Sequence, residues 1–292
     1  MKPAFSIKYA ATGRARALSL PLLWSAQLAL VGLCALALKS YYSTATADDL
    51  RWILAPTTAL VALFSGQHFE FESYAGYMSS DHRFVIAVPC AGVNFLITAF
   101  LMVTLRRLWR ERYRAIRWRF IPLAGLLAYV STIITNTTRI WLALELRERS
   151  VAISGLTNSQ LHRLEGIVVY FGFLLLLFLL LERFETATPL RLTRVLPFPL
   201  AIYYATTLGI PLLNGAFRQR SAFVEHSVFV LVLPLLLLAP LALFVRMQKP
   251  YGPHLPRLLA LFNRIRAGVV RAVAALHAAT TAADGNRAKH IF

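Results

Sequence analysis

Long apolar runs separated by short polar segments dominate this sequence. Each run approaches the roughly 20 residues that an α-helix needs to cross the hydrocarbon core of a bilayer. The pattern therefore predicts six transmembrane helices, at about residues 17–38, 84–105, 120–143, 164–181, 196–213 and 227–245.

A seventh apolar stretch, WILAPTTALVALFS at 52–65, is too short to span comfortably and contains Pro56. It suits an interfacial or re-entrant helix. The segment after it, 66–83, is acidic and aromatic and contains Gly66 and Gly76, which favours an irregular or hairpin-like cap at the membrane surface. The expected fold class is an all-α polytopic membrane protein.

Composition supports this class. The chain has 292 residues, of which 58% are hydrophobic, and a formal net charge of +18. Its mean hydropathy is +0.59. Because the basic residues stand beside the apolar runs, we expect them to face anionic membrane lipids, and no nucleic-acid partner is expected.

The basic residues also orient the chain, because cytoplasmic loops carry an excess of Lys and Arg. Residues 1–16 contain four basic residues and no acids, and residues 106–119 contain seven arginines against Glu111. Both segments should therefore lie in the cytoplasm, which requires an even number of crossings between them. We expect 52–65 not to cross, and both termini to be cytoplasmic.

Three regions follow from this topology. Residues 1–16 form a cytoplasmic N-terminus, 17–246 the transmembrane domain and 247–292 a cytoplasmic tail. Within the tail, Arg257, Arg264 and Arg271 recur every seven residues beside an apolar stripe. This pattern predicts an amphipathic helix on the inner membrane surface, with docking of a regulatory partner as the alternative.

Charged residues inside membrane spans are costly, which makes Arg139 a candidate functional residue. It lies in the outer third of 120–143, and Asn136 stands three residues earlier on the same helical face. Two structural interpretations stay open: Arg139 could snorkel to the outer headgroups, and Asn136 could bond a neighbouring helix.

Cys90 lies near the outer end of 84–105, and His162 lies at the outer mouth of 164–181. Asn94 follows Cys90 by one turn and could orient a substrate or bond another helix. Glu165 could pair with His162 or with Arg163 or could be a first-turn carboxylate.

The predicted topology places Cys90, Arg139 and His162 at one depth on one side of the membrane. A histidine near a cysteine favours the thiolate, and an arginine can stabilise the oxyanion of a tetrahedral intermediate. The three residue types therefore form a candidate site for nucleophilic catalysis.

The remaining cysteine and histidines are weaker candidates. Cys34 is best interpreted as a small packing residue. His68 and His82 lie in the predicted cap and could replace His162 as base. His226 opens the last span, and His254, His277 and His290 are expected on the cytoplasmic side. There is no CxxC and no zinc-site spacing, so we expect no cofactor and no metal.

Two other classes of protein stay open. A transporter or lipid flippase could use Arg139 to bind an anionic group, although the sequence shows little sign of the inverted repeats that many transporters contain. A noncatalytic assembly subunit would need none of these residues individually.

Three segments resemble the exosortase/archaeosortase family: VPCAGVNFLI around Cys90, NTTRI around Arg139 and LHRLEGIVVYF around His162. The likeness covers about residues 50–182, includes LAPTTALV and the outer loop after it, and points to the exosortase K branch. The family's usual segment has Ser near the Cys. Here the segment is Pro-Cys-Ala-Gly, which bears on the subgroup and substrate motif more than on the nucleophile.

The resemblance implies a cysteine transpeptidase of the bacterial cytoplasmic membrane with an extracytoplasmic active site. Its partners would be exported proteins that end in a short motif, a transmembrane helix and a basic tail. Cys90 would be the nucleophile, His162 the general base and acid, and Arg139 the oxyanion stabiliser, with Asn136, Asn94 and Glu165 in support.

Overall fold

The structure, a computed structural model, describes residues 6–111, 116–149, 157–185, 196–213 and 220–247. The fold is mostly helical. Five helices are long and apolar enough to cross a membrane, which confirms the expectation of a polytopic membrane protein: Leu22–Thr44, Val88–Glu111, Phe120–Glu148, Gln160–Glu185 and Phe223–Pro240. The predicted cytoplasmic helix at 247–292 lies outside the described residues, except for Met247.

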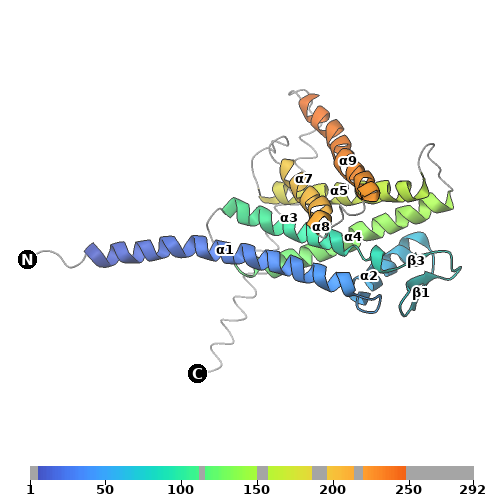
Figure 1. Ribbon diagram of the computed structural model, residues 1–292, viewed down its shortest axis with the longest axis horizontal. Coiled ribbons are helices and arrows are strands. Elements are labelled where there is room, and N and C mark those ends of the chain that lie inside the picture. The colour runs from blue at the N-terminus through green and yellow to red at the C-terminus, as the bar shows by residue number, and fades with distance from the viewer. Residues whose placement is uncertain (1–5, 112–115, 150–156, 186–195, 214–219, 248–292) are drawn as a thin grey trace, which may run out of the picture.

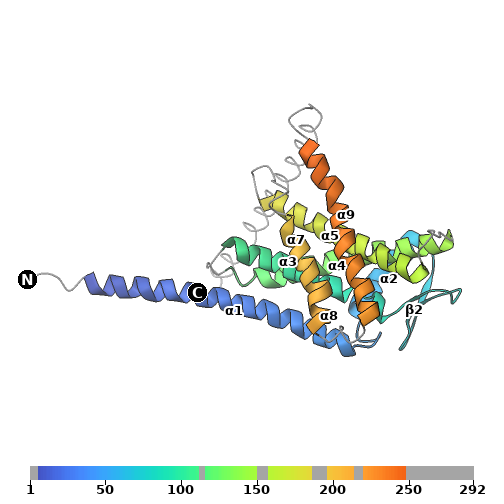
Figure 2. The ribbon, with the colours of Figure 1, turned by 45° about the horizontal axis from the view of Figure 1, so that its top comes forward.

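Four of the long helices share one general direction, and the C-terminal helices cross them (Figures 1 and 2). α1 runs along the edge of the bundle beside α3, and it extends past the other helices at its N-terminal end. The long helices are α1 (Ser6–Thr44), α3 (Val93–Glu111), α4 (Phe120–Glu148), α5 (Asn158–Glu185) and the crossing helix α9 (Arg220–Met247).

The fifth predicted span, 196–213, is not among the five spanning candidates of the described residues. It consists of α7 (Pro197–Tyr204), the π-helical turn η2 (Ala205–Gly209) and α8 (Ile210–Leu213). A π turn shifts the backbone hydrogen bonds from i→i+4 to i→i+5, so the run is not one regular helix. Among the described residues, five helices are therefore long and apolar enough to cross a membrane.

The short apolar stretch predicted at 52–65 forms α2 (Arg51–Ser65). Pro56 has no N–H, so the carbonyl of Trp52 lacks its intrahelical donor. The Tyr129 hydroxyl of α4 donates to that carbonyl at 2.6 Å, and the rings of Trp52 and Tyr129 stack at 5.7 Å. The proline therefore helps to dock α2 against α4.

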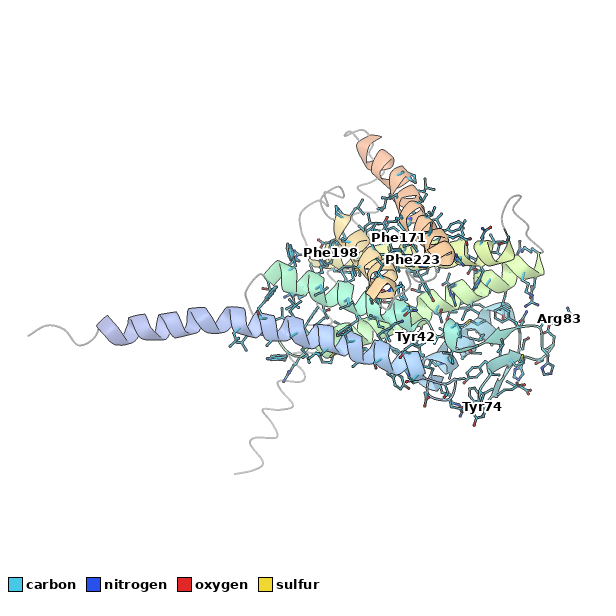
Figure 3. The ribbon with its side chains drawn as sticks, viewed as in Figure 1. Tyr42, Tyr74, Arg83, Phe171, Phe198 and Phe223 are labelled. Atoms are coloured by element: carbon cyan, nitrogen blue, oxygen red, sulfur yellow. The ribbon has the colours of Figure 1, made fainter. Side chains whose placement is uncertain are left out.

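The cap predicted at 66–83 departs from an all-α fold. The segment predicted to be irregular or hairpin-like forms a three-stranded antiparallel sheet in the order β1 (Phe69–Glu72), β2 (Gly76–Ser79), β3 (Val85–Ile86). Gly76 is required where β2 approaches β3, because a Cβ there would clash with the Ile86 carbonyl oxygen. Figure 3 shows Tyr74 and Arg83 at the edge of this cap.

The last turn of α4 holds the cap against the bundle. The Gln67 amide donates to the Glu148 carboxylate at 2.6 Å, and the Arg147 guanidinium donates to the carbonyl oxygen of Arg83. The cap therefore covers the end of the bundle where β3 leads into α3.

The helix expected to begin at residue 84 begins instead at Val93. Residues 85 and 86 pair with β2, and η1 (Val88–Cys90) is a single 3-10 turn. Strand pairing competes with the helix at these positions, and Gly92 then takes a positive φ of 73° that ends the turn. The prediction of an early start was wrong because the apolar run includes the strand.

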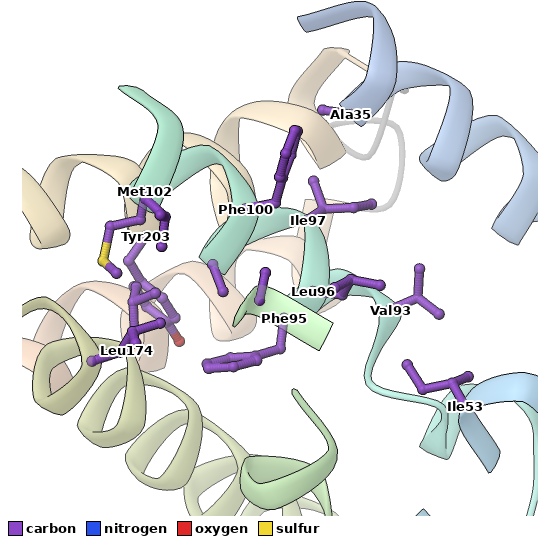
Figure 4. Packing of buried hydrophobic residues seen from close by; sticks show 14 of the residues in the cluster. Ala35, Ile53, Val93, Phe95, Leu96, Ile97, Phe100, Met102, Leu174 and Tyr203 are labelled. Atoms are coloured by element: carbon purple, nitrogen blue, oxygen red, sulfur yellow. The ribbon is translucent and has the colours of Figure 1, made fainter. Parts of the chain in front are cut away.

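α3 is the central helix of the core. Its buried side chains point toward several different neighbours, which agrees with a helix that is apolar on most of its surface. Figure 4 shows Phe95, Ile97 and Phe100 directed toward different helices, with Leu174 and Tyr203 packed below Met102. Burial of this helix fixes the position of the Cys90 turn that precedes it.

An ionic cluster around the buried Arg106 joins α3 to α5 and consists of Arg106, Arg110, Glu182 and Glu185. The end of the bundle that contains this cluster is here called the arginine end. Arg106 is only 4% exposed, and its Nε lies 2.7 Å from Glu182 and its Nη1 2.9 Å from Glu185. Arg110 reaches Glu185 at 3.3 Å. Two carboxylates thus neutralise a guanidinium that would be costly to bury alone.

α1 runs antiparallel to α3. Near the arginine end, the Trp24 indole donates to the Leu108 carbonyl at 3.0 Å, and the fully buried Gln27 amide bonds both backbone groups of Ile116. At the opposite end, here called the cysteine end because it contains Cys90, Lys39 bonds Asn94 at 3.0 Å. The N-terminal part of α1 and the arginine-rich segment therefore share one end of the bundle.

We expect Arg106→Met to lower the free energy of unfolding by about 3 kcal/mol, because it leaves buried carboxylates without their main cation. Arg107→Met is the matched control: Arg107 is 38% exposed and pairs with Glu111 at 2.8 Å, so its loss should cost less than about 1 kcal/mol. Denaturant unfolding in detergent measures both. Equal losses would contradict a structural role for the buried cluster.

Candidate functional site

Cys90 lies in a tight turn directly before α3. Its N–H donates to the Ala87 carbonyl at 2.8 Å, and the Ala91 N–H donates to the Val88 carbonyl at 3.0 Å. Pro89 suits the start of this turn because its φ is fixed and its missing N–H is not needed there. Gly92 then redirects the chain into α3, which leaves Cys90 half-buried just before the helix N-terminus.

One turn of α4 contacts Cys90 from two sides. Asn136 is completely buried, and its Nδ2 donates to the backbone carbonyl of Cys90. Arg139, three residues later on the same face, is near enough to Cys90 to act on it electrostatically. The structure therefore places Cys90 and Arg139, two of the three residues expected to converge, close together, with Asn136 beside them.

Gly92 is shaped to the same turn of α4. A Cβ at Gly92 would lie 2.9 Å from Asn136 Cγ, closer than side chains approach one another. The positive φ independently disfavours any L-residue there. The start of α3 can approach Asn136 only because this residue has no side chain.

Tyr170 of α5 completes the cluster. Its hydroxyl donates to Asn136 Oδ1 at 3.0 Å. Its ring centroid lies 5.3 Å from the Arg139 guanidinium carbon, a cation–π distance, and 5.3 Å from the Phe95 ring. One aromatic residue thus contacts both α4 side chains that hold Cys90.

Arg139 differs from the arginines at the other end of the bundle. In the part of the chain that the structure describes, no carboxylate lies within ion-pair distance of Arg139, and its buried Nε has no hydrogen-bond acceptor. Glu165 is near enough to act on it electrostatically. Arg139 therefore keeps most of its charge available to the thiol and to a ligand.

His162 lies near the start of α5. Its side chain is 56% exposed, and its Nδ1 lies 3.3 Å from Glu165 Oε2. Glu165 is buried, and its other oxygen has no hydrogen bond within the described residues. Among the described contacts, Glu165 is the partner of His162 and no bond reaches Cys90. Because Nδ1 faces Glu165, Nε2 is the nitrogen left to face a substrate.

Asn94 bonds another helix, one of its two expected roles. Its Oδ1 accepts from Lys39 of α1 at 3.0 Å. Tyr42, labelled in Figure 3, lies in the same part of α1 and donates from its hydroxyl to the Val88 carbonyl at 3.4 Å. The Cys90 turn is therefore held from α1 as well as from α4.

The sequence interpretation did not identify Tyr42, Gly92 and Tyr170. A signal for Tyr170 was present: His162, Gly166 and Tyr170 recur every four residues, which places them along one helical face. That face meets Arg139, since a Cβ at Gly166 would lie 3.8 Å from Arg139 Cδ. Tyr42 had no local signal, because its role depends on how α1 packs.

The other histidines lie apart from Cys90 or outside the described residues. His68 and His82 belong to the cap, where the His68 carbonyl accepts from Ser80. His226 of α9 bonds the backbone of Thr207. The three histidines expected in the cytoplasm are not described: His254, His277 and His290. In the described ranges, no group of three or more His, Cys, Asp and Glu residues could hold a metal ion.

Comparison of the chain with protein family models, with curated proteins and with solved structures found no match. Chemically, the site combines a thiol, an arginine without a carboxylate partner among the described residues and an acid–imidazole pair. A nearby cation stabilises a thiolate, and the same cation can stabilise an oxyanion formed when that thiolate attacks a carbonyl. The arrangement is suited to acyl transfer.

We expect Gly92→Ala to lower the free energy of unfolding by about 2 kcal/mol, from the positive φ and the contact with Asn136. Gly172→Ala is the matched control: Gly172 lies inside α5, and no atom lies within 4 Å of the position that an alanine methyl would take there. Alanine should therefore stabilise that helix by up to about 1 kcal/mol. Denaturant unfolding in detergent tests the pair. A neutral Gly92→Ala would contradict the close approach of α3 to Asn136.

Proposed function

We propose that this protein is a membrane-embedded cysteine peptidase or transpeptidase that cleaves C-terminal sorting signals of exported proteins. The observation that carries the proposal is the cluster of Asn136, Tyr170 and Arg139 at the Cys90 turn, in which Arg139 has no carboxylate within ion-pair distance among the described residues. Cys90 and Arg139 come from different elements, and a hydrogen bond from buried Asn136 holds the thiol's backbone in place.

In the proposed reaction, His162 takes the proton of the Cys90 thiol and Arg139 stabilises the thiolate. The thiolate attacks the carbonyl carbon of the scissile peptide bond. A C–S bond forms, and the guanidinium stabilises the tetrahedral oxyanion. Collapse breaks the C–N bond, and His162 gives a proton to the leaving amine. The product is a thioester between the substrate and Cys90.

Resolution of the thioester repeats these steps in reverse. His162 takes a proton from an acceptor nucleophile, either a surface group or water, which attacks the thioester carbon. The C–S bond breaks and the thiolate leaves. Glu165 supports His162 by binding Nδ1, which directs Nε2 to the reacting atoms.

The substrate class and orientation rest on the family resemblance and on charge. The arginine end suits the cytoplasmic side, so the cysteine end would face the exterior of the bacterial cytoplasmic membrane. A sorting signal made of a short motif, a transmembrane helix and a basic tail would match this polarity, with the motif at Cys90 and the tail at the cytoplasmic side.

A second candidate function is transport or flipping of an anionic lipid. The observation that favours it is again Arg139, because a cation at membrane depth without a carboxylate partner in the described ranges could bind a headgroup. A transport function gives no reason for the hydrogen bonds that hold the Cys90 turn. A noncatalytic subunit explains neither feature.

We expect Cys90→Ala to abolish processing, because the nucleophile is lost, and Arg139→Ala to slow it by about 100-fold or more, as for a lost oxyanion donor. The substrate is a tagged exported protein of the same genome that carries the three-part C-terminal signal. Processing is followed by its change in size, and Cys34→Ala is the control cysteine.

The outcome separates the classes of function. If Cys90→Ala still processes the tagged protein, Cys90 is not the nucleophile. If Arg139→Ala reduces lipid movement in vesicles while Cys90→Ala has no effect, the transporter candidate replaces the peptidase.

The orientation has its own test. In the Cys34→Ala protein, a membrane-impermeant thiol reagent should label Cys90 when added to the exterior of spheroplasts and not when added to inside-out vesicles, because the charge bias places Cys90 outside. Labelling only in inside-out vesicles would reverse the topology. Labelling of the denatured protein controls for the presence of the thiol.

A further inference from the structure

We infer that Tyr170 is the positioning residue of this site, with two arms: its hydroxyl aligns the Cys90 turn through Asn136, and its ring aligns the Arg139 guanidinium. The inference rests on the proposed function for the roles of the thiol and the guanidinium, whereas the contacts themselves do not depend on it.

The hydroxyl arm controls which way the Asn136 amide points. The carbonyl of Cys90 can only accept a hydrogen bond, so it requires the NH2 end of the amide. The Tyr170 hydroxyl donates to the other end, Oδ1, at 3.0 Å. An amide rotated by 180° would direct Oδ1 at the Cys90 carbonyl oxygen, which is repulsive. The hydroxyl therefore favours the one orientation that holds the turn.

The ring arm controls the guanidinium. Arg139 has no carboxylate to fix its direction among the described residues, and the Tyr170 ring at 5.3 Å provides a cation–π surface instead. Across the helix interface, Gly166 leaves room for the Arg139 stem. The guanidinium is thus held near the thiol without being neutralised.

The two arms act together because of helical geometry. Asn136 and Arg139 are three residues apart on α4, so one side chain on α5 reaches both. Tyr170 is itself fixed by the Phe95 ring of α3, 5.3 Å away. Packing alone would be served equally by phenylalanine, so the hydroxyl is the feature that a positioning role explains.

The test measures the reactivity of Cys90 in purified full-length protein that carries Cys34→Ser, which leaves one thiol. The probe is iodoacetamide, a small neutral alkylating reagent, at fixed pH and in excess. We expect Tyr170→Phe to slow alkylation about fivefold, the effect of one lost hydrogen bond, and Tyr170→Leu to slow it at least about 20-fold because both arms are lost.

The coupling to Asn136 distinguishes positioning from general packing. In an Asn136→Ala background, Tyr170→Phe should have no further effect beyond about twofold, since the hydroxyl acts through that amide. Tyr170→Leu should still slow alkylation there, because the ring acts on Arg139. An equal effect of Tyr170→Phe with and without Asn136 would overturn the hydroxyl arm, and a silent Tyr170→Leu in that background would overturn the ring arm.

Tyr129→Phe is the matched control. It also removes one interhelical hydroxyl bond, to the Trp52 carbonyl at 2.6 Å, but at the α2 interface. Its alkylation rate should stay within about twofold of the parent. Unfolding in denaturant confirms that each variant is folded, and a Tyr170→Phe protein that is folded and alkylates at the parent rate overturns the inference.

Processing of the tagged exported protein provides the second readout. We expect Tyr170→Phe to lower kcat about fivefold with KM within about twofold, because a misplaced nucleophile affects the chemical step rather than binding. If alkylation slows as expected but Cys90→Ala still processes substrate, the proposed function fails and the positioning of Cys90 stands. If processing depends on Cys90 but Tyr170→Phe changes KM alone, the positioning role fails.

Discussion

The hydrogen bond from the buried Asn136 amide to the Cys90 carbonyl is the interaction on which the cysteine end depends. Irregular backbone is tolerated at membrane depth only where its polar groups are satisfied within the protein. The turn between β3 and α3 meets this condition through Asn136, and Gly92 allows the approach. This contact joins the Cys90 turn directly to α4, while Gln67 and Arg147 hold the sheet to the last turn of the same helix.

The two ends of the bundle hold their arginines in opposite ways. Arg106 is 4% exposed and has two carboxylates within hydrogen-bonding distance, which makes it a structural clamp between α3 and α5. Arg139 has an aromatic ring and a thiol beside it and no ion pair in the described residues. A partly buried charge whose Nε has no hydrogen-bond acceptor in the described residues is costly, which favours an electrostatic role for Arg139 in the site.

The candidate site was predictable in part, and the reason differs from residue to residue. Arg139 and Asn136 were identified because polar groups are conspicuous in an apolar span. Cys90 was identified because the charge of the loops predicts the same end of the spans for Cys90 and Arg139. The sequence did not identify Tyr170 and Gly92, because aromatic residues and glycines are common in membrane helices and have no evident role until their partners are known. His162 was placed at the correct end, but its contact with Glu165 depends on the rotation of α5.

The sequence by itself determined that the chain is mostly helical and where five of its long apolar helices lie, because the length of an apolar run is a local property. It predicted α2 almost to the residue. Only the tertiary structure decided where α3 begins, since strand pairing with β2 overrides the apolar run. Only the tertiary structure placed Tyr170 between Asn136 and Arg139. Both depend on contacts between residues far apart in the chain, which no local pattern contains.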